Sequence, residues 1–95
     1  MYGIIVEPEA LQDLIQIHTF ITSKDSKTKA DRFIRELENT ILTLSEMPLR
    51  CRKSYYVDDE QTRDLIYKGY TIVFHIREVN IHILTVFRQK VFEEK

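Results

Sequence analysis

The hydrophobic positions in the first half of the chain recur at helical spacing, in two successive runs. In the first run, over residues 8–22, apolar residues lie four, three and four positions apart, and Pro8 stands where proline favours a helix start. The second run begins after a polar turn, where Ser26 or Thr28 can cap the helix, and Pro48 lies just past its end. Because the connection is short, an antiparallel helix hairpin is expected. The apolar stripes consist of Ala10, Leu14, Ile17 and Ile21, and of Ala30, Phe33, Ile34, Leu37, Ile41 and Leu44.

After Pro48 the hydrophobic pattern changes to the alternation of a β-strand. Every second residue over 70–76 is bulky and apolar, and residues 81–87 form another strongly β-prone run. Residues 68–69 precede the first of these runs and residues 78–80 separate the two, so both are predicted to be tight turns. The predicted strands are a short N-terminal one at residues 2–6 and a meander of residues 64–67, 70–77 and 80–87.

These elements predict a single α+β domain over residues 1–95. An N-terminal strand is followed by an antiparallel helix hairpin, which must bury its apolar stripe on one face of an antiparallel β-sheet, giving two layers. Of the 95 residues, 43% are hydrophobic and 31% are charged, which suits one compact core and differs from a disordered chain. A domain of this size is only marginally stable alone, so a partner that covers apolar surface would stabilise it.

The sequence carries no feature of a membrane or exported protein. No apolar run approaches the roughly 20 residues needed to cross a bilayer. The N-terminus lacks the basic start and the long apolar stretch of a secretory signal. Cys51 is the only cysteine, which excludes an internal disulfide. A cytoplasmic protein is therefore predicted.

Charge is divided unevenly along the chain, although the net charge is only -1. Residues 1–49 hold five Lys and Arg against eight Asp and Glu, a net of -3, whereas residues 50–90 hold eight against five, a net of +3. The basic residues of the second part can form a patch beside the sheet that suits a phosphate backbone or an acidic peptide. An ordinary solvated surface is the alternative. The basic residues are Arg50, Arg52, Lys53, Arg63, Lys68, Arg77, Arg88 and Lys90.

Few groups have the spacing of a catalytic or metal-binding motif. There is no glycine-rich phosphate loop, and the histidines and Cys51 are too scattered for a metal-ligand motif, so no metal or cofactor is expected. Cys51 lacks a CxxC partner and is expected to be an inert thiol. His75 and His82 fall on neighbouring predicted strands, and imidazoles can act as general acids and bases. Whether they share a face depends on strand register, which the sequence leaves open, and ordinary surface histidines are the simpler interpretation.

Short residue patterns follow one another in a fixed order along nearly the whole chain. The predicted helices carry Ala10-x-x-Asp13-Leu14-x-x-Ile17, then Phe20-Ile21, then Ala30-x-x-Phe33 and Leu37-x-x-x-Ile41-x-x-Leu44-x-x-x-Pro48. The predicted sheet carries Arg63-Asp64-Leu65, Gly69-Tyr70-x-Ile72-x-Phe74-x-Ile76 and Ile83-Leu84-x-Val86-Phe87-Arg88-Gln89. Each pattern is degenerate, but together they resemble the RelE/ParE family of toxins from bacterial type II toxin–antitoxin systems.

The resemblance implies a toxin encoded beside a cognate antitoxin, with which it forms a hetero-oligomer. In this family the antitoxin wraps the toxin with an extended or helical segment and blocks its site, and the toxin inhibits growth once the antitoxin is degraded. Two mechanisms occur in the family: RelE-like members cut mRNA in the ribosomal A site, whereas ParE-like members inhibit DNA gyrase. A non-toxic module that retains antitoxin binding is a third alternative.

The sequence departs from the RelE-like pattern at three positions. Thr71 follows Tyr70 where RelE-like enzymes have an arginine, and an acidic Asp64 is unfavourable beside a phosphate. Phe92, after the last strand, cannot transfer a proton as the C-terminal tyrosine of those enzymes does. The departures favour the ParE-like branch and DNA gyrase as the target, with ribosome-dependent mRNA cleavage as the alternative. The catalytic candidates of that alternative are Arg63, Arg77 and Arg88, with His75 or His82 as acid–base groups, and the candidates for target or nucleic-acid binding are Arg52, Lys53 and Lys90.

Overall fold

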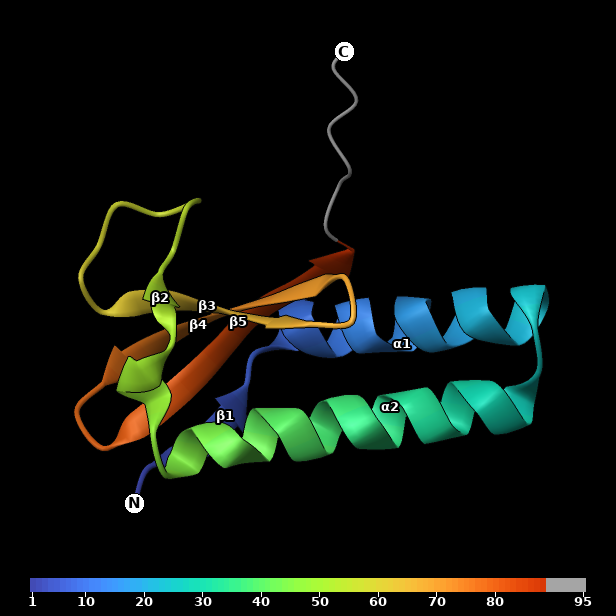
Figure 1. The fold of residues 1–95 in the computed structure, drawn as a ribbon, viewed down its shortest axis with the longest axis horizontal. Coiled ribbons are helices and arrows are strands. Elements are labelled where there is room, and N and C mark those ends of the chain that lie inside the picture. The colour runs from blue at the N-terminus through green and yellow to red at the C-terminus, as the bar shows by residue number, and fades with distance from the viewer. Residues whose placement is uncertain (89–95) are drawn as a thin grey trace, which may run out of the picture.

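The computed structural model describes residues 1–88 and arranges them in two layers, a helix hairpin packed on one face of a five-stranded sheet (Figure 1). The predicted α+β class, helix hairpin and three-stranded meander are confirmed. The helices are α1 (Pro8–Lys24) and α2 (Lys27–Leu42), followed by two short 3-10 turns, η1 (Thr43–Ser45) and η2 (Pro48–Arg50). The strands are β1 (Gly3–Val6), β2 (Arg52–Lys53), β3 (Thr62–Tyr67), β4 (Tyr70–Arg77) and β5 (Asn80–Arg88).

The sheet has the strand order β1-β5-β4-β3-β2 and is mixed rather than purely antiparallel. β3, β4 and β5 form the antiparallel meander, whereas β1 lies parallel to β5, with Gly3 opposite Asn80. Parallel neighbours need a long connection, and the helix hairpin forms part of it. The sequence predicts the N-terminal strand but not its pairing, so the expected antiparallel sheet is corrected at this edge. β2 was not predicted, because two residues are too few to show an alternating pattern.

The start of α2 follows a capping group that the sequence offers. Of the two predicted caps, Ser26 is the one used, since its hydroxyl accepts a hydrogen bond of 3.1 Å from the Lys29 amide. α2 ends at Leu42, and the chain then tightens into η1, which still buries Leu44 as the predicted stripe requires. The apolar stripe therefore runs past the end of the α-helix itself.

Two tight turns join the meander strands, as predicted. Lys68 and Gly69 have positive φ angles of 47° and 84°, as in the hairpin turns that match the twist of the flanking strands. The second turn holds Glu78 at a φ of 57°, a left-handed conformation that is uncommon for a residue with a side chain. The turn lengths fix the register of β4 against β3 and β5.

The core lies between the hairpin and the sheet, where Leu37 of α2 and Phe74 of β4 are completely buried. The opposite sheet face is partly covered by the segment 54–61, and Thr71 and Val73 are buried there. We call this second side the open face. Among residues 1–88, neither helix is long and apolar enough to cross a membrane.

An irregularity in β5 separates two stretches of regular pairing with β4. Ile83 pairs with Phe74. The next pair along the strands is Thr85 with Val73, so Leu84 is an extra residue in β5. This is the two-against-one arrangement of a β-bulge.

The bulge changes the face of the sheet toward which the side chains at the end of β5 point. His82, before the bulge, lies on the open face. Val86, after it, is 2% exposed and packs in the core, and Arg88 pairs with Tyr70, a core residue. Strict alternation from His82 would place Val86 and Arg88 on the open face, and the bulge moves both to the helix side.

Candidate functional site

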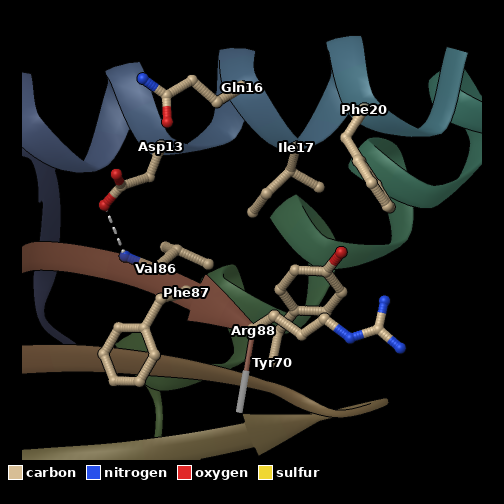
Figure 2. Close-up of a pocket in the computed structure, with 8 residues that line it drawn as sticks. All are labelled: Asp13, Gln16, Ile17, Phe20, Tyr70, Val86, Phe87 and Arg88. Atoms are coloured by element: carbon tan, nitrogen blue, oxygen red, sulfur yellow. Dashed lines mark hydrogen bonds between the residues drawn. The ribbon is translucent and has the colours of Figure 1, made fainter. Parts of the chain in front are cut away.

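A cleft of about 430 Å³ lies between α1 and the end of the β4–β5 pair (Figure 2). Its walls are mainly apolar. Asp13 and Arg88 lie toward opposite ends of the cleft in this view, which gives an apolar surface with an acidic and a basic end (Figure 2). The lining residues are Asp13, Gln16, Ile17 and Phe20 from α1, and Tyr70, Val86, Phe87 and Arg88 from the strands.

Asp13 fixes the strand edge that borders the cleft. Its Oδ2 accepts a hydrogen bond of 2.9 Å from the Val86 amide and one of 2.6 Å from the Thr85 hydroxyl (Figure 2 draws the first). β1 pairs with β5 only as far as Ile83, so the carboxylate satisfies an amide that lies beyond the paired part of this edge. Asp13 therefore joins α1 to the part of β5 that forms the other wall.

Arg52, a predicted target-binding residue, anchors the segment that covers the open face. Its Nη2 lies 3.3 Å from Oδ2 of Asp64, whose side chain has no exposed surface. The Arg52 guanidinium also stacks on the Tyr55 ring, 3.7 Å from its centroid. Asp64 accepts a further hydrogen bond of 3.1 Å from the Tyr55 amide. Asp64, the acidic residue that argued against a phosphate site, thus holds a loop in place.

Arg63 and Lys53 also have partners within the chain. Arg63 pairs with Phe74 and so lies on the helix side of β3, where its Nη1 donates to the Cys51 carbonyl at 2.8 Å. Lys53 forms an exposed ion pair of 3.1 Å with Glu60. Arg63 therefore braces the chain just before β2, and the charge of Lys53 is partly neutralised.

Arg77 and Arg88, the other two catalytic candidates, lie at opposite ends of the β4–β5 pair. Arg77 pairs with Asn80 beside the turn, whereas Arg88 pairs with Tyr70 at the far end. They also lie on opposite faces, because the bulge turns Arg88 toward the helices. The structure does not bring Arg63, Arg77 and Arg88 into one constellation. Lys90, the last target-binding candidate, lies outside the described residues.

The remaining chemical candidates are a cysteine, two positions compared with RelE-like enzymes, and two histidines. Burial raises the pKa of the Cys51 thiol, which keeps it protonated and unreactive near neutral pH. Thr71 is completely buried, so the position where RelE-like enzymes carry an arginine has no surface here. Phe92 lies outside the described residues. His75 and His82 pair directly across β4 and β5, which answers the question of register that the sequence left open.

The α1 wall of the cleft was not among the predicted site residues. Phe20 is apolar and yet 47% exposed, and Asp13 reaches across to β5. Both belong to the family-like pattern of the first helix, and that pattern is the only sequence signal that marked them. Helical spacing gives no reason to expect a cleft beside them.

Comparisons with known proteins agree on one family and one fold. The family model described as the ParE toxin of type II toxin–antitoxin system, parDE, matches residues 4–91. No curated protein matches the chain. A solved structure, "Chromosomal ParDE TA system from P. aeruginosa", matches with a TM-score of 0.82 and 16% sequence identity, covering 95% of this chain and 98% of that chain. At this identity the structural likeness shows the shared fold.

Proposed function

Because the chain belongs to the ParE toxin family of type II toxin–antitoxin systems, we propose that it arrests growth by binding DNA gyrase through the cleft beside Arg88. Family membership makes it the toxin component of such a pair, with an antitoxin as its partner. Gyrase is the target that the ParE-like branch implies. The cleft offers a mainly apolar surface with one charged residue at each end, which suits a segment of another protein.

The observation that carries this proposal is the combination of an apolar cleft with an exposed arginine at one end. Phe20, which is 47% exposed, offers apolar contact area, and Arg88 can pair with a carboxylate of the bound segment. Arginine and aromatic residues dominate the binding energy of many protein interfaces. A binding inhibitor needs such a surface and no proton-transfer groups.

The positions of the other cations support a binding inhibitor over a nuclease. Phosphodiester cleavage needs donors that converge where charge develops on the phosphate. Arg63 donates to a backbone carbonyl, Arg52 is held by a buried carboxylate, and Arg77 lies at the other end of the β4–β5 pair. Arg88 is thus the only one of these four arginines that borders the cleft.

We also propose that the antitoxin covers this cleft in the toxin–antitoxin hetero-oligomer. Antitoxins of the wider family block the toxin's site with an extended or helical segment. A segment with apolar side chains and one acidic residue would fit the cleft and pair with Arg88. The toxin would then become active when that segment is removed.

The test is a gyrase supercoiling assay with purified toxin, scored also for trapped cleaved DNA. The wild-type chain is expected to inhibit in proportion to dose. Arg88→Ala is expected to raise the half-inhibitory concentration roughly thirty-fold, the effect of losing an interface arginine worth about 2 kcal/mol. Arg77→Ala is the matched control, since it removes an exposed strand-end arginine at the other end of the same strand pair.

Four outcomes would contradict parts of the proposal. No effect of saturating wild-type toxin on gyrase would exclude gyrase as the target. Equal loss in Arg88→Ala and Arg77→Ala would exclude the cleft as the contact surface. Cuts at the A site of a defined mRNA in a translation mixture, lost in Arg88→Ala, would establish the nuclease alternative, and induced expression without growth arrest would favour a non-toxic module.

A further inference from the structure

Two histidines lie directly opposite each other on the open face, near the turn that joins β4 and β5. His75 pairs with His82 in the β4–β5 register. Their side chains are 31% and 22% exposed, so both rings reach the surface. Directly opposed residues on one sheet face have their Cβ atoms only about 4.5–5.5 Å apart. We call these two residues the histidine pair.

The ring of His82 is oriented by a carboxylate on its outer side. Its Nδ1 lies 2.6 Å from Oε2 of Glu7, which follows β1 on the far side of β5. A carboxylate can only accept at this contact, so the hydrogen sits on Nδ1 of His82. In the neutral ring the lone pair is then on Nε2.

The ring of His75 is oriented in the same way by a chain of two partners. Its Nδ1 lies 2.9 Å from the Thr62 hydroxyl oxygen, and that hydroxyl donates to Oδ2 of Asp59 at 3.2 Å. A hydroxyl has one hydrogen, so Thr62 can only accept from His75, whose Nδ1 must carry the hydrogen. Asp59 itself lies 3.5 Å from the same nitrogen. The lone pair of His75 is therefore also on Nε2.

The two rings turn their basic nitrogens toward a common space. Nδ1 of His75 faces β3 and Nδ1 of His82 faces the end of β1, which are opposite directions across the sheet. The Cδ2–Nε2 edges accordingly face each other over the β4–β5 pair. We propose that the histidine pair binds a borderline-soft divalent cation such as Zn²⁺ through its two Nε2 atoms.

The outer contacts of the histidine pair are those of metal-ligating histidines. Such histidines generally donate the other ring N–H to a carboxylate or another acceptor, which fixes the tautomer and raises ligand basicity. Here Glu7 and the Thr62–Asp59 chain supply those acceptors. The two carboxylates, of Glu7 and Asp59, outnumber the single positive charge of Arg77, which lies further along β4. The local charge therefore favours a cation over an anion.

The coordination would be completed by water. Within residues 1–88, no three histidine, cysteine or acidic side chains converge on one point, so the pair supplies the two protein ligands. Two imidazoles select Zn²⁺ and similar ions over Mg²⁺, which prefers oxygen ligands. No metal was expected from the sequence, because the two histidines are seven positions apart and only the register brings them together. This site lies on the open face and does not depend on the proposed function of the cleft.

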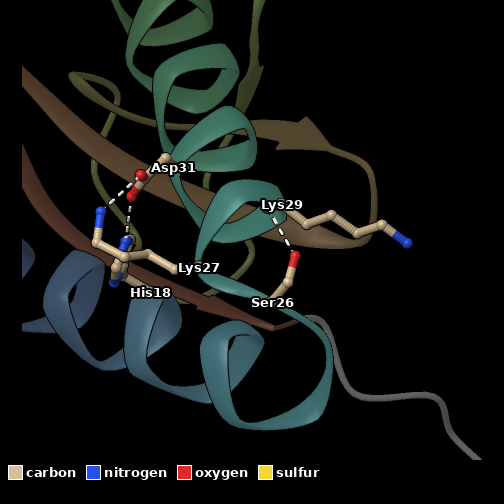
Figure 3. A network of polar contacts seen from close by, with 5 residues as sticks. All are labelled: His18, Ser26, Lys27, Lys29 and Asp31. Atoms are coloured by element: carbon tan, nitrogen blue, oxygen red, sulfur yellow. Dashed lines mark hydrogen bonds and ion pairs between the residues drawn. The ribbon is translucent and has the colours of Figure 1, made fainter.

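Calorimetric titration of Zn²⁺ into the full chain, without a histidine tag, tests the proposal. One saturable site is expected, and Mg²⁺ should give none. His75→Gln and His82→Gln should each lower the affinity more than tenfold, and Glu7→Gln about tenfold through the lost outer contact. His18→Gln is the matched control, because Nε2 of His18 is already engaged with Asp31 at 2.7 Å (Figure 3).

Unchanged Zn²⁺ affinity in both His75→Gln and His82→Gln would overturn the proposal, as would an equal loss in His18→Gln. Substitutions at the histidine pair can disturb the sheet, so the wild-type chain provides a second readout. In its NMR spectrum, Zn²⁺ should shift the imidazole signals of His75 and His82 and leave those of His18 in place. Shifts at His18 alone, or no imidazole shifts at saturation, would also overturn it.

Discussion

Asp64→Ala is expected to lower the free energy of unfolding by about 1 kcal/mol. The carboxylate is completely buried and accepts from the Tyr55 amide at 3.1 Å and from Arg52 at 3.3 Å. A hydrogen bond to a charged group contributes about 1.5–3 kcal/mol, and an ion pair whose partner is 33% exposed adds at most about 1 kcal/mol. Against this, Oδ1 of Asp64 is buried without a partner, a cost of about 1–3 kcal/mol that the substitution removes. The favourable contacts outweigh this cost, but not by much.

Equilibrium unfolding in urea, with the midpoint and slope both fitted, measures the effect. Asp64→Asn should cost about half as much, because its amide oxygen still accepts from Tyr55 while the attraction to Arg52 is lost. Asp58→Ala, an exposed carboxylate in the same loop, is the control and should stay within about 0.5 kcal/mol of the wild type. If Asp64→Ala is neutral or stabilising, the desolvation of this buried charge exceeds its contacts, and the anchoring role assigned to it is wrong.

Three further predictions concern the core, a turn and the helix hairpin. Leu37→Ala should cost about 2–5 kcal/mol in the same urea assay, because the leucine is completely buried, and a loss below 1 kcal/mol would contradict the core packing. Gly69→Ala should cost about 1 kcal/mol of unfolding free energy through backbone strain alone, because φ is 84° and no atom lies within 4 Å of an added Cβ. A stabilised variant would contradict this turn geometry. Hydrogen bonds from His18 and then Lys27 lower the pKa of Asp31 from its ordinary value of 3.8 (Figure 3). The stability that the Asp31 carboxylate contributes is therefore fully present above pH 3.8 and is lost as the pH falls through the lowered pKa. Asp31→Asn should therefore flatten the acid side of the pH–stability curve, and an unchanged curve would contradict the assigned contacts.

The elements that could be predicted are those whose signal is local. The stripe from Ala30 to Leu44 and the alternation over 70–76 each follow from the period of one element, and both were recovered. The parallel pairing of β1 was not recovered, because it depends on β5, far along the chain. The strand β2 was not recovered, because two residues are too few to show an alternating pattern. The same holds for the pairing of His75 with His82, which required the register.

The role of the basic residues was harder to predict for a different reason. Charge counting treats each arginine as available to a ligand, but a buried acceptor can hold it in place. Arg52 faces the carboxylate of Asp64, and Arg63 faces the carbonyl of Cys51, so both already have partners within the chain. The sequence left open whether the basic residues form one patch, whereas the structure distributes Arg52, Arg63, Arg77 and Arg88 over two faces and both ends of the sheet.

The face of the sheet on which Arg88 lies is determined by the burial of a neighbouring residue, Val86. Alternation from His82 puts Arg88 on the open face with Arg77, and this would leave Val86 outside the core as well. Burying a valine contributes about 1.5–3 kcal/mol, so the arrangement that keeps Val86 at 2% exposure is strongly favoured. The extra residue Leu84 permits it by shifting the rest of β5 through one position. The hydrophobic effect at Val86 thus carries Arg88 to the helix side, and the cleft acquires its cation as a consequence of packing in the core.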